Sequence, residues 1–292
     1  MRPIMTNPQD KDVAAQSAAL LAESNHVVGA RRNAVSITVL RRLALIGILA
    51  LALGIRIINL NLIGYNSDEA VYAGQGAAIA QVPVITEFFP VFRAHPLLFQ
   101  FSLAVLYKIF GLHDMIGRTA SALIGVVTVY LVYLLGKRLY GRQAGLIAAL
   151  LFAVMPYHVV PTRQVLLDGP MTLMSTLALY SLARFGDSER PIWLYAAGVS
   201  MGLTFLAKET GILLVGSIYA FLALSPEIRV RIRDLIISVV LMAITMSPHF
   251  LAVSFAGGGS GGKTGQYLVW QLFRRPNHTW DFYLTVVPPA IG

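Results

Sequence analysis

Acidic side chains at two places in the chain have the chemistry to accept a proton. Asp68 and Glu69 come just before an alanine-rich stretch, and Asp168 comes just before a Gly-Pro pair. A carboxylate can take a proton from an attacking hydroxyl group or bind a cation. These positions also suit helix starts: Asn66 could be an N-cap with Glu69 as its capping-box partner, and Asp168 a turn residue or N-cap. For Asp68, spacing alone leaves the two interpretations evenly matched.

Basic side chains could stabilise negative charge near these acids. Arg118 and Lys208 each border an apolar stretch, where a cation can equally mark the membrane interface. Arg56 interrupts an apolar run, so its side chain could extend to the interface or line a cleft. Asp68 and Glu69 could help to hold a divalent metal ion, but adjacent acids without a full ligand set leave metal dependence open. The sequence identifies no definite cofactor.

Composition places these residues in a membrane protein. The chain has 292 residues, of which 56% are hydrophobic and 13% are charged, whereas soluble domains carry about 25% charged residues. The absence of cysteine excludes disulfides, thiolate metal sites and a cysteine nucleophile. The net charge of +9 would suggest nucleic acid in a soluble protein. In a membrane protein such a surplus lies in cytoplasmic loops, so we expect no nucleic-acid partner.

Apolar runs predict about seven membrane helices and the start of an eighth, because a span takes roughly 17–25 apolar residues. The predicted spans are Leu43–Leu60, Thr119–Gly136, Ala144–Pro161, Gly169–Ala183, Ile192–Ala207, Thr210–Pro226 and Leu235–Ala256. The eighth begins at Phe282–Ile291, where the chain stops, so we expect a fragment truncated at its C-terminus. Residues 1–36 predict a disordered cytoplasmic arm, and residues 37–292 a transmembrane module. The expected fold is an all-α polytopic membrane helical bundle with an outer-face loop and interfacial helices.

The distribution of charge predicts how this bundle is oriented in the cell membrane. Loops rich in basic residues usually lie on the cytoplasmic side of a membrane. We therefore expect the amino terminus and the clusters Lys137–Arg142 and Arg229–Arg233 to be cytoplasmic. Apolar runs of about 10–14 residues are more often interfacial than spanning, so we expect Pro96–Phe110 to lie along the outer surface. The loops with Asp68 and Asp168 then fall on the outer face. This clustering is modest support for a site, because charges cost less at span ends than at the midplane.

Six short motifs resemble, in order along the chain, those of GT-C glycosyltransferases in the protein O-mannosyltransferase and aminoarabinose-transferase group. They are Asn66–Tyr72 (first external loop), Arg93–Leu97 (His-Pro-Pro, with Leu97 in place of the second proline), Arg118–Ala122 (Arg-x-x-Ser-Ala), Lys137–Gly141 (Arg-Arg-Leu-Phe-Gly), Asp168–Pro170 (Asp-x-Pro) and Lys208–Gly211 (Lys-x-Thr-Gly). No single motif is specific, whereas six in register over Arg41–Gly292 are strong support for the resemblance.

The resemblance implies an integral-membrane enzyme that moves a sugar from a polyprenyl-phosphate-linked donor to an acceptor hydroxyl on the outer face. The implied catalytic residues are Asp68, as base or acceptor organiser, Asp168 and Glu69. The implied substrate-binding residues are His95, Arg118, Lys208, Tyr72 and Arg56, of which the first three would meet the carrier phosphate. Cations there would stabilise the charge left on the phosphate. The sugar and the acceptor, whether protein, lipid or polysaccharide, stay open.

Two other functions compete with sugar transfer. A transporter or flippase-like carrier would place charges within its spans, whereas the five middle predicted spans have none. A non-catalytic membrane scaffold would tolerate replacement of Asp68. The loop Gly257–Thr264 matches the phosphate-loop pattern letter for letter. It follows an apolar span rather than a sheet strand, so we expect no nucleotide at this loop.

Overall fold

All regular structure in the described part of this computed structural model is helical. The described residues are 39–62, 64–88, 95–224, 228, 230–255, 273, 281 and 285, and they include no strand. The chain divides into two units, Met1–Gly47 and Ile48–Gly292. In the first unit, residues 39–47 are helical. The predicted arm, the Gly257–Thr264 loop and all but one residue of Phe282–Ile291 lie outside the described residues.

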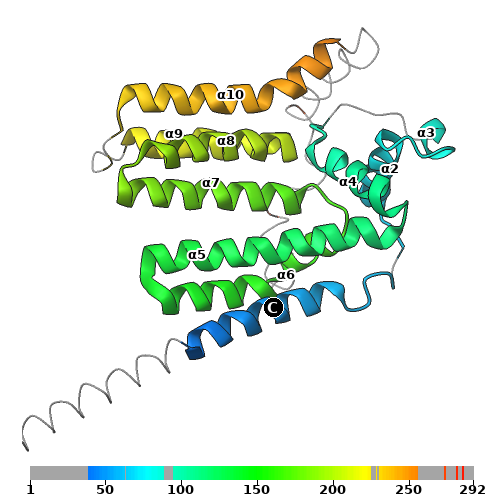
Figure 1. Cartoon of the computed structure of the whole chain (residues 1–292), viewed down its shortest axis with the longest axis horizontal. Helices are drawn as coiled ribbons and strands as arrows, with labels where there is room; N and C mark the ends of the chain where they lie inside the picture. The colour runs from blue at the N-terminus through cyan, green and yellow to red at the C-terminus, as the bar shows by residue number, and fades with distance from the viewer. Residues whose placement is uncertain are drawn as a thin grey trace, which may run out of the picture. The chain divides into compact units, whose positions relative to one another are not determined.

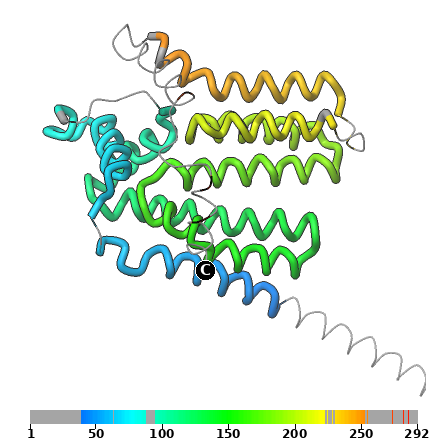
Figure 2. Tube along the Cα trace, turned by 180° about the vertical axis from the view of Figure 1, so that it is seen from behind, coloured from blue at the N-terminus to red at the C-terminus, as the bar shows by residue number. Residues whose placement is uncertain are grey.

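The second unit begins with helical residues 48–57. The next elements are α2 (Ser67–Ile79), α3 (Ile85–Phe88), α4 (Leu98–Phe110), α5 (Asp114–Val154), α6 (Pro156–Val159), η1 (Pro161–Arg163), α7 (Asp168–Ser188), α8 (Pro191–Ala207), η2 (Glu209–Gly211), α9 (Ile212–Leu224) and α10 (Ile232–Phe255). Within this unit α5, α7, α8 and α10 run alongside one another, and α2, α3 and α4 gather at one end of them (Figure 1). The same arrangement is seen from behind in Figure 2.

Helix α5 is a hairpin of two helical arms, which confirms the turn predicted between the second and third spans. The backbone leaves the helical region at Gly141, whose φ of +88° favours glycine. The arms pack closely at Gly145, where a Cβ atom would lie 2.7 Å from the backbone nitrogen of Lys137. The second arm ends at Val154, before the predicted Pro161. Pro156 explains this difference, because a proline holds the preceding residue in extended backbone and cannot continue the helix.

Helices α8 and α10 approach each other through small residues. Gly198 and Gly202 face α10, and a Cβ atom on Gly202 would lie 2.6 Å from the Cβ atom of Thr245. At Gly198 an added Cβ atom would meet the carbonyl oxygen of Ser238. The two glycines therefore allow close helix packing, which small residues permit inside a membrane.

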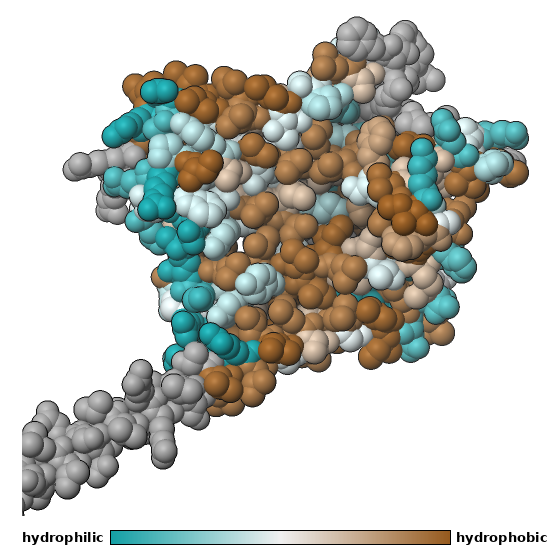
Figure 3. Space-filling view, viewed as in Figure 1, coloured by the Kyte–Doolittle hydropathy of each residue, from teal (hydrophilic) through white to brown (hydrophobic). Residues whose placement is uncertain are grey.

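Two described helices are long and apolar enough to cross a membrane by length and composition, namely α5 and residues Ile232–Ala252 of α10. Helix α4 has 13 residues and is therefore about 20 Å long, too short for a hydrocarbon core of about 30 Å. This length agrees with the prediction that Pro96–Phe110 does not span. Figure 3 shows an apolar middle along the long helices and polar residues at their ends. Exposed side chains such as Ile147, Leu151 and Ile244 contribute to the apolar surface.

Candidate active site at one end of the bundle

Asp68 lies in the first turn of α2, at one end of the long helices. Asn66 caps this helix, because its side-chain oxygen accepts a hydrogen bond from the backbone N–H of Glu69 at 2.8 Å. The predicted N-cap is confirmed, but the capping box is incomplete, since the Glu69 side chain turns inward. Asp68 is exposed in the first turn, where the helix dipole favours an ionised carboxylate. Within the described residues its side chain makes no hydrogen bond or ion pair.

Glu69 and Arg118 form a buried ion pair between α2 and α5. Arg118 donates from Nε and Nη2 to the two carboxylate oxygens of Glu69 at 2.7 and 2.8 Å. The Glu69 side chain is 1% exposed and the Arg118 side chain is 6% exposed. Glu69 also accepts from the backbone N–H of Val165 at 3.0 Å, and Arg118 donates to the carbonyl oxygens of Leu60 and Gly64. The pair therefore ties together the first turn of α2, the start of α5 and the segment before α7.

This arrangement leaves little room for the predicted metal at Asp68 and Glu69. Both oxygens of Glu69 already accept hydrogen bonds, and its side chain lies in the interior while Asp68 faces solvent. The described residues contain no group of three or more His, Asp or Glu side chains that could hold a metal ion. The two acids therefore do not form a ligand set in this conformation.

Two further pairs of polar side chains meet at the turn between α8 and α9. Lys208 donates from Nζ to the Oδ1 atom of Asp168 at 2.8 Å. His95 Nδ1 lies 2.9 Å from the Oε2 atom of Glu209. Asp168 is the first residue of α7, and its side chain reaches across to Lys208 rather than capping its own helix. His95 similarly contacts Glu209 and does not cap α4, whose N-cap is Leu97. The pairs bring residues from three separate segments together: His95, Asp168 and the adjacent Lys208 and Glu209.

Tyr72 and Arg56, which the resemblance placed with the substrate, lie in different surroundings. The Tyr72 ring meets the His95 ring edge-on, with centroids 6.1 Å apart, so it belongs to the same cluster. Arg56 is 0% exposed. Its guanidinium donates to Thr162 Oγ1 at 2.9 Å, to two backbone carbonyl oxygens, and lies 2.7 Å from His158 Nδ1. Arg56 therefore neither extends outward nor lines a cleft here, because these partners enclose it.

Three residues of this end of the bundle carried no clear signal in the sequence. Glu209 pairs with His95. Arg163 donates to the backbone carbonyl oxygens of Ile55 and Ile58, at the end of the first helix of this unit. Gln164 accepts a hydrogen bond from the Asn66 side chain at 3.0 Å. Their partners are about 100 residues away in the chain, so no local pattern could have revealed these contacts.

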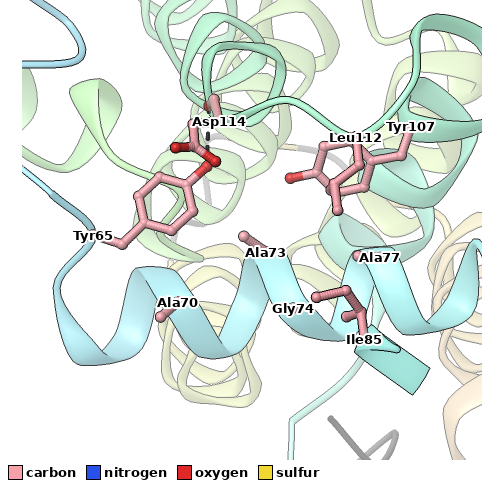
Figure 4. Close-up of a pocket in the computed structure, with 9 residues that line it drawn as sticks. All are labelled: Tyr65, Ala70, Ala73, Gly74, Ala77, Ile85, Tyr107, Leu112 and Asp114. Carbon is pink, nitrogen blue, oxygen red and sulfur yellow. Dashed lines mark hydrogen bonds between the residues drawn. The ribbon is translucent and has the colours of Figure 1, made fainter. Parts of the chain in front are cut away.

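Two cavities lie at this end of the bundle, and the smaller one lies beside α2. The smaller, of about 190 Å³, is shown in Figure 4 and is lined by Tyr65, Ala70, Ala73, Gly74, Ala77, Ile85, Tyr107, Leu112 and Asp114. Burial, together with the charges of Asp114 and Glu69, raises the pKa of Tyr107 to about 12, so its hydroxyl stays protonated. The larger cavity, of about 430 Å³, is lined in part by Arg118, Arg163 and Gln164. Arg118 is the one predicted site residue among the linings of these two cavities.

Two solved structures share this helical arrangement. ArnT from Cupriavidus metallidurans, crystallised with undecaprenyl phosphate, matches with a TM-score of 0.67 and 19% identity, over 83% of this chain and 47% of that one. The Saccharomyces cerevisiae protein O-mannosyltransferase complex Pmt1–Pmt2, bound to its sugar donor, matches with a TM-score of 0.51 and 20% identity, over 80% and 33%. The fold is therefore that of the GT-C membrane glycosyltransferases, an all-α membrane helical bundle.

Sequence comparison identifies the family. The model of the dolichyl-phosphate-mannose-protein mannosyltransferase family matches residues 94–251, more than half of the chain, and the chain belongs to this family. Two proteins of Bacillus subtilis, both named as candidate mannosyltransferases, are similar to it. YycA is 28% identical over 160 residues and YkcB is 31% identical over 143 residues. These matches cover 54% and 48% of this chain but only 23% and 20% of the relatives, so the chain spans less than a quarter of their length.

Proposed function

We propose that this chain carries the active site of a glycosyltransferase whose donor is a polyprenyl-phosphate-linked sugar and whose acceptor is a hydroxyl group on the outer face. The observation that carries the proposal is the meeting of the Asp168–Lys208 and His95–Glu209 pairs at the end of the bundle where Asp68 lies in the first turn of α2. The undecaprenyl phosphate held by ArnT and the family's description support the donor class. The predicted transmembrane module, residues 37–292, is the part proposed to hold this site.

Asp68 is proposed as the general base. It is exposed, and the transition state makes the acceptor hydroxyl acidic enough to give up its proton to this carboxylate. The acceptor oxygen then bonds to the sugar carbon, while the bond from that carbon to the phosphate oxygen breaks and its electron pair stays on the phosphate. Lys208 and His95 are proposed to stabilise this charge as it develops. Asp168 orients the Lys208 ammonium group.

The proposal assigns structural roles, not substrate contacts, to Glu69, Arg118 and Arg56. Glu69 and Arg118 satisfy each other inside the protein, and Arg56 is enclosed by Thr162 and His158. A buried guanidinium with all these partners would have to break them to reach a lipid phosphate, at a cost of about 1–3 kcal/mol for each group left unpaired. We therefore infer that these three residues set the position of Asp68 and of the helix ends around it.

Transfer of a radiolabelled sugar from its polyprenyl-phosphate carrier, in membranes that contain the whole protein, tests the proposal. We expect Asp68→Asn to reduce transfer at least 100-fold, the scale of a lost general base. Asp168→Asn should also reduce it, because Lys208 loses its partner. Asp187→Asn is the matched control, since Asp187 pairs with Arg138 and is largely exposed. Full transfer by Asp68→Asn would overturn the assignment of the base, and sugar uptake without transfer would favour a carrier.

A further inference from the structure

Two adjacent residues at the end of α8 reach two different helices. Lys208 is the C-cap of α8 and has extended backbone, with φ −159° and ψ 130°. Successive side chains of an extended segment point in opposite directions. Lys208 accordingly contacts Asp168 at the start of α7, whereas Glu209 contacts His95 just before α4. One short turn thus connects α7 with the layer formed by α2 and α4.

The Glu209 contact is enclosed and directional. The side chains of His95 and Glu209 are 21% and 13% exposed, and the Tyr72 ring stands edge-on to the imidazole. Burial alone would raise the pKa of the Glu209 carboxyl, but the hydrogen bond and charge of His95, with Lys208, bring it below its ordinary value. An ionised carboxylate can only accept, so Nδ1 of His95 is the donor. This fixes which ring nitrogen faces Glu209 and sets the plane of the ring.

We propose that Glu209 is a positioning residue for the reaction: it holds the His95 imidazole against Tyr72 while the neighbouring Lys208 holds Asp168, so that both halves of the site keep one spacing. The inference rests on the proposed function. Glu209 acts through His95, since its own carboxylate is largely buried and already paired. Without it the imidazole loses the hydrogen bond that orients Nδ1, and a misplacement of about 1 Å is enough to cost roughly 100-fold in rate.

Kinetics of sugar transfer separate positioning from a general structural effect. Glu209→Ala should lower kcat about tenfold to 100-fold while KM for the donor changes less than about threefold. Glu209→Gln should recover most of the rate, because the amide oxygen can accept the same hydrogen bond from Nδ1. Glu189→Gln is the matched control, because Glu189 is an exposed C-cap residue of α7. Wild-type kcat in Glu209→Ala, or no recovery in Glu209→Gln, would overturn the inference.

A double-mutant cycle gives a second measurement that needs no activity. His95→Ala, Glu209→Ala and the double variant are compared by thermal unfolding of the purified protein in detergent. If the pair is formed, the double variant unfolds at a temperature closer to the single variants than the sum of their shifts predicts. Additive shifts would overturn the pairing itself. If the wild type transfers no sugar, the proposed function is rejected, and the positioning role is rejected with it. Non-additive shifts in unfolding temperature would then still support the contact between His95 and Glu209.

Discussion

Arg118 binds Glu69 through two hydrogen bonds of 2.7 and 2.8 Å, although 49 residues separate the two in the chain. Both residues were predicted to act on substrates, as a phosphate-binding cation and a catalytic acid. In the structure the two charges pair with each other in the interior, and Asp68 is the residue before Glu69. A buried pair of this kind fixes the direction in which α2 leaves the bundle, and with it the place where Asp68 meets solvent.

The Glu69–Arg118 pair should be costly to break. Glu69→Ala leaves a buried guanidinium without its counter-charge, and we expect a loss of about 3–5 kcal/mol in the free energy of unfolding. The control is Asp187→Ala, which removes an ion pair to Arg138 whose Asp187 side chain is 58% exposed. That change should cost no more than about 1 kcal/mol. Denaturant unfolding in detergent compares them, and equal losses would contradict the structural role.

Close packing of α8 on α10 should make Gly202 intolerant of a side chain. Gly202→Val would place its Cβ atom 2.6 Å from that of Thr245, so we expect a loss of about 1–3 kcal/mol in the free energy of unfolding. Gly186→Ala is the matched control, because no atom lies within 4 Å of a Cβ atom built there in α7. The control should be neutral or slightly stabilising, since alanine suits a helix better than glycine. Thermal unfolding distinguishes the two outcomes.

Acid should remove the stability that the His95–Glu209 pair provides. The pKa of Glu209 in the folded protein lies below its ordinary value of 4.5. The contribution of a carboxylate with a lowered pKa is fully present above the unfolded pKa and is lost as the pH falls through the folded pKa. Above pH 4.5 the wild type should therefore unfold at a higher temperature than Glu209→Gln. This difference in unfolding temperature should narrow as the pH falls below 4.5. If the difference in unfolding temperature between the wild type and Glu209→Gln widens on acidification, the direction assigned to the pKa shift of Glu209 is wrong.

Single cysteines can test which end of the bundle faces outward, because the natural chain has none. Ser67→Cys lies beside Asp68, and Tyr140→Cys lies at the α5 turn, where Tyr140 is 80% exposed. The basic residues near that turn predict a cytoplasmic location. We expect a membrane-impermeant maleimide to label Ser67→Cys in intact cells and Tyr140→Cys only after permeabilisation. The reverse pattern would remove the proposed outer-face site.

Features that depend on neighbouring residues could be predicted from the sequence. The helix start at Asn66, the reversal near Gly141 and the short, non-spanning helix after Pro96 all follow from local chemistry. A cap, a positive φ and a length are fixed by a few consecutive residues. Gly198 and Gly202 are four residues apart and share one face of α8, a spacing that is typical of close helix packing.

The partners of individual charges were decided by tertiary structure alone. The sequence marked Arg56, Arg118 and Glu69 as unusual charges in an apolar chain, and the motifs placed all three with the substrate. In the folded protein their side chains are buried, because their partners come from segments far away in the chain. Glu209 occupies the variable position of the Lys208–Gly211 motif and had no predicted role, yet an extended residue at the end of α8 directs it to His95. A charge in a low-dielectric interior takes the partner that the fold brings within hydrogen-bond distance, and only the assembled helices determine which partner that is.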